Sequence, residues 1–268
     1  MTTRSFPVTG PLTLVARLGH GSLTVTAQDD LDEAKVTLVP RKGSTLERMT
    51  VELSGSELSV IAPRQGGIFD LPIFNGIGRG RNAVDVSVAV PSGTAMRISV
   101  FTADITVVGR AGSTNISFGS SHAAVDTVEG DLVLRFGSGN AQVERVRGSA
   151  TVRSGSGSVR IGEVDGALTS GFGSGDLSVG RAHGKVRSRA GSGAALIEAA
   201  YSDVDLASGS GALTLGLPVG VSARLDVVSG SGDVATELPI ESSPTEKRTP
   251  ISVRARTGSG PVRIVTAA

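Results

Sequence analysis

Cysteine and tryptophan are both missing from this chain of 268 residues. Without cysteine the protein can form neither disulfide bonds nor cysteine-ligated metal centres. Aromatic residues make up 3% of the chain and include a single tyrosine, so few side chains are available for sugar rings to stack on. These absences weigh against a disulfide-stapled secreted domain and against aromatic recognition of carbohydrate.

An excess of either charge is also lacking. Lysine plus arginine total 26 and aspartate plus glutamate total 25, so the net charge is +1 and a nucleic-acid partner is not indicated. The longest uncharged apolar stretch, residues 211–223, contains three glycines and a proline and is too short to span a membrane. No apolar leader follows the first residues. We therefore expect a cytoplasmic protein with no membrane span, with peripheral association at the cell envelope as the alternative.

Glycine, in contrast, is abundant, with 37 residues, and much of it recurs at a fixed interval. Gly-Ser-Gly triplets begin at residues 137, 155, 173, 191 and 209, which are 18 residues apart. The sequence at 119–121 is a degenerate copy in the same phase. A second column with the same interval consists of Gly112, Gly130, Gly148, Gly166 and Gly184. A constant period with two glycine turns in each unit is typical of a solenoid.

Apolar residues alternate with polar ones between these turns, which predicts two short strands in each repeat. The same columns remain apolar from one repeat to the next, as in Val125, Val143, Ile161 and Val179. We therefore predict an all-β fold: a parallel β-solenoid (β-helix) with 18-residue coils over residues 95–236. Irregular β-strands and a long loop at 63–82 occupy residues 1–94 before it. Residues 237–268 are predicted to form a loop followed by a hairpin-like pair or a terminal coil.

Charged residues also recur at the 18-residue interval, and their sign alternates. Opposite charges on neighbouring strands contribute about 0.2–1 kcal/mol per pair, whereas a slipped coil would bring like charges together. We interpret these residues as a structural charge ladder that maintains the register of the coils. It comprises Glu129, Arg145, Arg147, Glu163, Asp165 and Arg181, and Lys185 precedes Asp203, as Arg187 precedes Asp205, by the same interval.

The segment 63–82 does not follow the repeat and is unusually apolar for a connection of this length. Long loops within compact domains are uncommon and often functional. We expect this segment either to cap an open end of the solenoid or to dock a protein partner. The side chains that would do so are Ile68, Phe69, Leu71, Ile73, Phe74 and Ile77.

Residue patterns typical of catalytic or metal centres do not recur in the repeat. The three histidines, His20, His122 and His183, occupy unrelated repeat positions, which disfavours a zinc site. A calcium-binding β-roll needs an aspartate in every turn, but the position of Asp176 holds histidine, asparagine, serine or alanine in the other coils, at His122, Asn140, Ser158, Ala194 and Ala212. The glycine triplets have no following Gly-Lys-Ser/Thr, and no histidine is placed to activate a serine. We predict no enzymatic activity, no cofactor and no metal.

The unit Gly-Ser-Gly-Asp-Leu-Ser-Val at 173–179, its partial copy at 230–234 and the segment Val-Ala-Val-Pro-Ser-Gly at 88–93 resemble a known bacterial family. This is the family of β-strand-repeat proteins called putative adhesins, a domain family of unknown function. The resemblance covers most of residues 8–266 and implies a role linked to the cell envelope. We expect a non-enzymatic scaffold or protein-interaction module that binds a protein partner or self-associates. The alternative is a glycan-binding or glycan-active β-helix protein.

Overall fold

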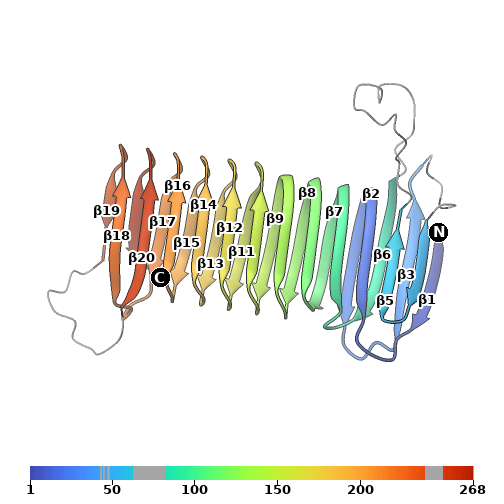
Figure 1. Ribbon diagram of the computed structural model, residues 1–268. Coiled ribbons are helices and arrows are strands. Elements are labelled where there is room, and N and C mark those ends of the chain that lie inside the picture. Colours follow the sequence, from blue (N-terminus) through green and yellow to red (C-terminus); the bar gives the residue numbers. More distant parts are fainter. Residues whose placement is uncertain (43, 45, 47–48, 63–82, 239–249, 268) are drawn as a thin grey trace, which may run out of the picture. The chain divides into compact units, whose positions relative to one another are not determined.

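The computed structural model describes residues 1–42, 44, 46, 49–62, 83–238 and 250–267. Over these ranges the chain is all-β (Figure 1), which confirms the predicted fold class. It divides into two compact units, Met1–Val125 and Asp126–Ala268. The boundaries that the sequence predicts at residues 94 and 236 stay predictions. The six apolar residues proposed as a cap or docking segment, Ile68 to Ile77, lie outside the described residues.

The N-terminal unit is organised around one long strand, β2 (Thr13–Gln28), which bends at Gly21, where φ is +121°. Its first half pairs in parallel with β5 and its second half with β6, while β7 pairs in parallel along its whole length. The antiparallel partners β4 and β3 extend these sheets, and β1 pairs with β3. The other strands of this unit are β1 (Thr2–Pro7), β3 (Glu33–Pro40), β4 (Thr50–Ser54), β5 (Glu57–Ile61), β6 (Ala83–Pro91) and β7 (Ala95–Ala111), and β8 (Thr114–Val128) crosses the boundary between the units.

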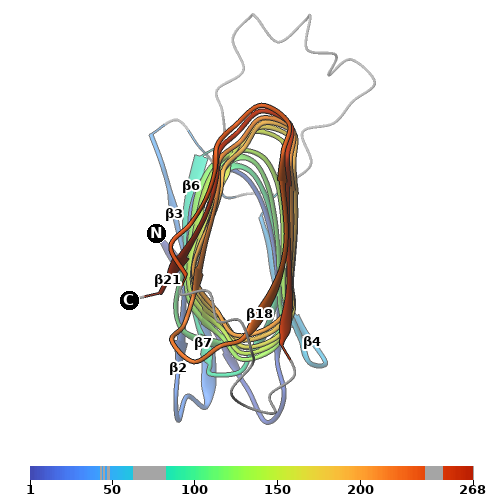
Figure 2. The ribbon, with the colours of Figure 1, turned by 90° about the vertical axis from the view of Figure 1, so that its left-hand side faces the viewer.

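The C-terminal unit is a β-solenoid whose coils each contribute one strand to each of two parallel sheets (Figures 1 and 2). We call the first the arginine sheet; it contains residues 132–136 of β9 (Leu132–Val146) with β10 (Ala150–Ser154), β12 (Leu168–Phe172), β14 (Val186–Ala190), β16 (Val204–Ser208), β18 (Ala223–Ser229) and β20 (Ile251–Thr257). The companion sheet contains residues 140–146 of β9 with β11 (Ser158–Val164), β13 (Leu177–Ala182), β15 (Ala195–Ala200), β17 (Leu213–Leu217), β19 (Val234–Thr236) and β21 (Val262–Thr266).

Strand register in this unit follows the 18-residue period. In the arginine sheet Leu132, Ala150, Leu168, Val186 and Val204 lie opposite one another in successive strands, and each is buried. The alternation of period two sends these residues inward and their neighbours outward. Because no single coil can bury its apolar side, stacking of the coils creates the core.

The last glycine of each triplet is required by the close approach of successive coils. A Cβ atom on Gly193 would lie 1.8 Å from the carbonyl oxygen of Gly175, and one on Gly175 would lie 1.9 Å from that of Gly157. Neither distance is compatible with a side chain. Glycine recurs at this position because the backbones of successive coils are in contact at this corner of the solenoid.

The coil formed by β20 and β21 is last in the sequence but not in space. β20 pairs in parallel with both β16 and β18, and β21 pairs with both β17 and β19, so residues 251–266 lie between two earlier coils (Figure 1). The expectation of a hairpin-like pair or terminal coil was therefore wrong. This place in the stack buries Val253, Ala255, Val262 and Ile264, which are at most 1% exposed, whereas Leu225 and Val234 of the β18–β19 coil, which is paired on one side only, are 38% and 51% exposed.

Candidate functional site

The most densely charged cluster of the C-terminal unit lies where β11 and β13 of the companion sheet end. Glu163 accepts a hydrogen bond from Arg181 Nη2 at 2.9 Å, and its other oxygen lies 3.0 Å from His183 Nε2. Arg145 Nη1 is 3.3 Å from Glu163, while its Nη2 is 3.2 Å from Asp165. The side chain of Glu163 is only 13% exposed, so neighbouring charges surround it.

These contacts keep Glu163 ionised. The hydrogen bond from Arg181 lowers the pKa of Glu163 from its usual range, although partial desolvation acts in the opposite direction. The hydrogen bond with His183 and the charge of Arg145 lower the pKa further. A carboxyl group held in this way is an ion-pair partner, whereas a general acid needs a raised pKa.

The six residues of the predicted charge ladder all take part in ion pairs, in two groups. Arg147 Nε lies 3.2 Å from Glu129, and the remaining four form the cluster around Glu163. The 18-residue interval places Arg147 between Glu129 and Asp165. In the structure Asp165 instead pairs with Arg145, which lies two residues before Arg147 in the same coil. That these pairs control register remains a prediction, since proximity alone does not measure their effect.

A metal ion in this cluster would compete with arginine side chains for the same carboxylates. Ligand atoms of Glu163, Asp165 and His183 lie within 4.8 Å of one another, the one such group among the described residues. The same two carboxylates already receive Arg145 and Arg181. A cation bound there would have to displace both guanidinium groups, so the arrangement favours ion pairing over metal coordination.

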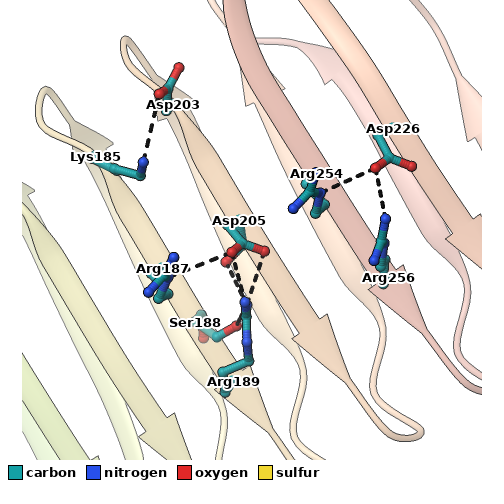
Figure 3. Close-up of polar contacts among 9 residues, drawn as sticks. All are labelled: Lys185, Arg187, Ser188, Arg189, Asp203, Asp205, Asp226, Arg254 and Arg256. Carbon is teal, nitrogen blue, oxygen red and sulfur yellow. Dashed lines mark hydrogen bonds and ion pairs between the residues drawn. The ribbon is translucent and has the colours of Figure 1, made fainter.

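The outer surface of the arginine sheet carries a second set of charged contacts (Figure 3). Arg189 binds both oxygens of Asp205, with distances of 3.0 and 2.7 Å, and Arg187 Nε lies 3.6 Å from the same carboxylate. The hydrogen bond from Arg189 lowers the pKa of Asp205.

The neighbouring coils repeat this arrangement. Asp226 lies 3.1 Å from Arg254 Nε and 2.9 Å from Arg256 Nη2, and these hydrogen bonds, that of Arg256 foremost, lower its pKa. Each aspartate is thus shared by two arginines (Figure 3), which leaves positive charge on this surface.

Sequence reasoning identified part of this second set. The 18-residue interval predicts the pairs Lys185–Asp203, at 3.8 Å, and Arg187–Asp205. It does not predict Arg189, which reaches Asp205 at an interval of 16, or Asp226, whose arginine partners lie on the inserted strand β20. The stacking of Tyr201 on His183, with ring centroids 4.7 Å apart, follows the 18-residue period and could have been found.

The remaining histidines belong to the N-terminal unit and have separate partners. His20 Nδ1 forms a hydrogen bond with Thr102, and His122 Nδ1 lies 3.6 Å from Asp104. Helices with the length and hydropathy needed to cross a membrane are not found in the described ranges.

Comparisons with known proteins agree with this architecture. The crystal structure of a "putative adhesin" from Parabacteroides distasonis is similar at a TM-score of 0.51 and 14% identity, covering 98% of this chain and 96% of that one. A second "putative adhesin", from Bacteroides fragilis, has a TM-score of 0.48 and 13% identity, with 98% and 96% covered. No curated protein matches the sequence. The Toastrack DUF4097 family model matches residues 19–268, and because this match extends over most of the sequence, the chain belongs to that family.

Proposed function

We propose that this chain is a non-enzymatic interaction module that joins a second copy of itself through an open strand edge. The edge belongs to the β18–β19 coil, whose strands pair, among the described residues, only with β20 and β21. Its free backbone groups form a row that can accept another strand. This open edge is the observation that carries the proposal.

The side chains of the same coil support it. Leu225 is 38% exposed and Val234 is 51% exposed, although their register partners Val253 and Val262 are buried. Val228, on the outward face of β18 opposite Arg256, is also 51% exposed. A strand from a second copy would cover these groups and complete the hydrogen bonding of the edge.

The state of the carboxyl groups supports a non-enzymatic role. The five described carboxyl groups with a shifted pKa are all shifted downward, and each has an arginine partner; they are Asp29, Asp85, Glu163, Asp205 and Asp226. Acid–base catalysis at neutral pH instead depends on a carboxyl group whose pKa is raised. The naming of similar structures as adhesins also agrees with a binding role.

Sedimentation of the full chain over a range of concentrations tests this function. We expect a concentration-dependent dimer that the double variant Leu225→Lys/Val228→Lys abolishes, because lysine on an edge strand opposes pairing. The matched control is Leu196→Lys/Val108→Lys, which adds the same charge at exposed apolar residues of β15 and β7, strands that do not belong to the edge coil. A wild-type chain that stays monomeric at every concentration, or a control that dissociates equally, would refute the proposal.

A further inference from the structure

One pair of facing residues in the C-terminal unit breaks the pattern of alternating charge. In the described strands of this unit, six pairs of register partners consist of two charged residues. Five of these pairs have opposite sign: 145/163, 163/181, 187/205, 205/254 and 226/254. The exception is Arg135 on β9, which lies opposite Arg153 on β10. Both side chains are exposed, and neither has a carboxylate partner among the described residues.

Like charges directly opposite each other on neighbouring strands are destabilising. The five pairs of opposite sign show that the sequence can place an acidic residue opposite an arginine on these sheets, and here it does not. A local cost without a compensating contact is expected where a surface has a function.

The next residue in the same row is a glycine with no structural reason to be one. Gly171 is the register partner of Arg153 on one side and of Arg189 on the other. Its φ lies outside the left-handed region, and a Cβ atom placed on it would meet nothing within 4 Å. Glycine inside a strand is destabilising relative to alanine, because it loses more backbone freedom on folding. Such a glycine marks a place where a ligand can approach the backbone closely.

These residues form a straight row that crosses the strands of the arginine sheet. Neighbouring strands lie about 4.8 Å apart, so the row from Arg135 through Arg153 and Gly171 to Arg189 extends over about 14 Å. Arg189 is held in place by its two hydrogen bonds to Asp205, which orients its guanidinium group in advance. Two hydroxyl side chains, Thr151 and Thr169, face each other in the adjacent row on the same surface.

We propose that this arginine row, defined as Arg135, Arg153, Gly171 and Arg189, binds an acidic polysaccharide that carries carboxylate groups. The guanidinium group matches a carboxylate in a bidentate geometry, and several such contacts along one polymer add through multivalency. The bare backbone at Gly171 lets the sugar chain lie close to the sheet between two cations. The threonine hydroxyls exchange hydrogen bonds with sugar hydroxyls. This surface is separate from the β18–β19 edge and goes beyond the proposed self-association.

The surroundings of the row favour this polymer over two other anionic partners. Single-stranded nucleic acids are bound with aromatic side chains on which bases stack, and β10, β12 and β14 have no exposed aromatic residue. A lipid surface is bound more firmly when apolar side chains insert into it, and these three strands have no exposed large apolar residue. Arginine and hydroxyl groups on a flat strip instead suit a hydrated acidic polymer.

The test is binding of the full chain to immobilised polygalacturonate, with neutral dextran, dextran sulfate and phosphatidylglycerol vesicles as comparison probes. We expect binding to polygalacturonate that weakens with added salt, and none to dextran. The variant Arg135→Gln/Arg153→Gln should bind at least about tenfold more weakly, because two charge-assisted contacts are lost. The variant Gly171→Val should do the same by filling the gap, with an unchanged or raised melting temperature. The matched control, Arg160→Gln/Arg263→Gln, removes the same charge from the companion sheet and should change binding less than about twofold.

Several results would overturn the inference. One is binding to dextran as strong as binding to polygalacturonate, and another is a loss of binding in the control variant equal to that in Arg135→Gln/Arg153→Gln. A third is binding to dextran sulfate that is as strong as binding to polygalacturonate and is unaffected by Arg135→Gln/Arg153→Gln. That third result would indicate attraction by diffuse charge alone. Binding to the vesicles but not to polygalacturonate would assign the row to a lipid surface and refute it. Release of reducing ends from the polymer would instead refute the proposed non-enzymatic function, while the proposal that the row binds the polymer would stand. The edge variant Leu225→Lys/Val228→Lys should leave polymer binding unchanged, which separates this test from that of self-association.

Discussion

The two sheets of the C-terminal unit share a core but differ in their outer surfaces. Within its strands the arginine sheet carries seven arginines and two aspartates, whereas the companion sheet carries four arginines and three glutamates. The inward residues of both sheets are mostly apolar and buried, and the arginine sheet also buries Ser170, Ser188, Ser208 and Thr257. The difference teaches that register and stacking depend on the core and the glycine corners, which leaves the outer positions free to acquire a binding surface. A net charge of +1 for the whole chain conceals this asymmetry.

The largest effect should come from the shared core, and it should be the same on both sides. Leu206 of the arginine sheet is 0% exposed and Leu215 of the companion sheet is 1% exposed. Changing either to alanine should lower the free energy of unfolding by about 2–5 kcal/mol, since each leaves a cavity. Urea denaturation measures this, with Leu225→Ala at the open edge as a control that should lose less. A loss below about 1 kcal/mol for one of the two core variants would show that the sheets do not share a core in the way described.

A smaller effect should distinguish the companion sheet under acid. The pKa of Glu163 is lowered in the folded protein, chiefly by Arg181, so its ionised form stabilises the fold above the ordinary glutamate value of 4.5. That contribution is lost as the pH falls from 4.5 through the lower folded value. Glu163→Gln should cost about 1–3 kcal/mol at neutral pH and should flatten the fall of melting temperature in acid. Calorimetry at several pH values decides the matter: an acid profile identical to that of the wild type would mean that Glu163 does not contribute.

The smallest effect should appear at the arginine row. Arg153→Thr removes one member of the like-charged pair and should raise the free energy of unfolding by a few tenths of a kcal/mol at low salt. Arg160→Thr on the companion sheet, where the register partner is Gln142, should leave stability unchanged. Denaturation at low and high salt measures the difference. If Arg153→Thr destabilises the protein at low salt, the row has a structural role and the comparison between the two sheets loses its meaning.

Much of the architecture follows from the amino-acid sequence. The sequence is sufficient to predict the 18-residue coils, the glycine turns at their corners and the columns of inward-facing apolar residues. Each coil repeats the same constraints on backbone and core, so the pattern recurs along the chain. The pairs at an interval of 18, such as Lys185–Asp203 and Arg187–Asp205, were readable for the same reason. A charge in a fixed position of one coil lies beside the same position of the next.

The tertiary structure alone decided two further features. Arg189 reaches Asp205 diagonally, because a long flexible side chain bonds to whichever carboxylate lies within its reach, and spacing in sequence does not encode that choice. The order of the last coils was likewise invisible: the spacing of the triplets places residues 223–236 beside 204–217, yet residues 251–266 lie between them. The cost of closing a loop rises only slowly with its length, so residues 251–266 can pair between two earlier coils, where burial of Val253 and Ile264 stabilises them.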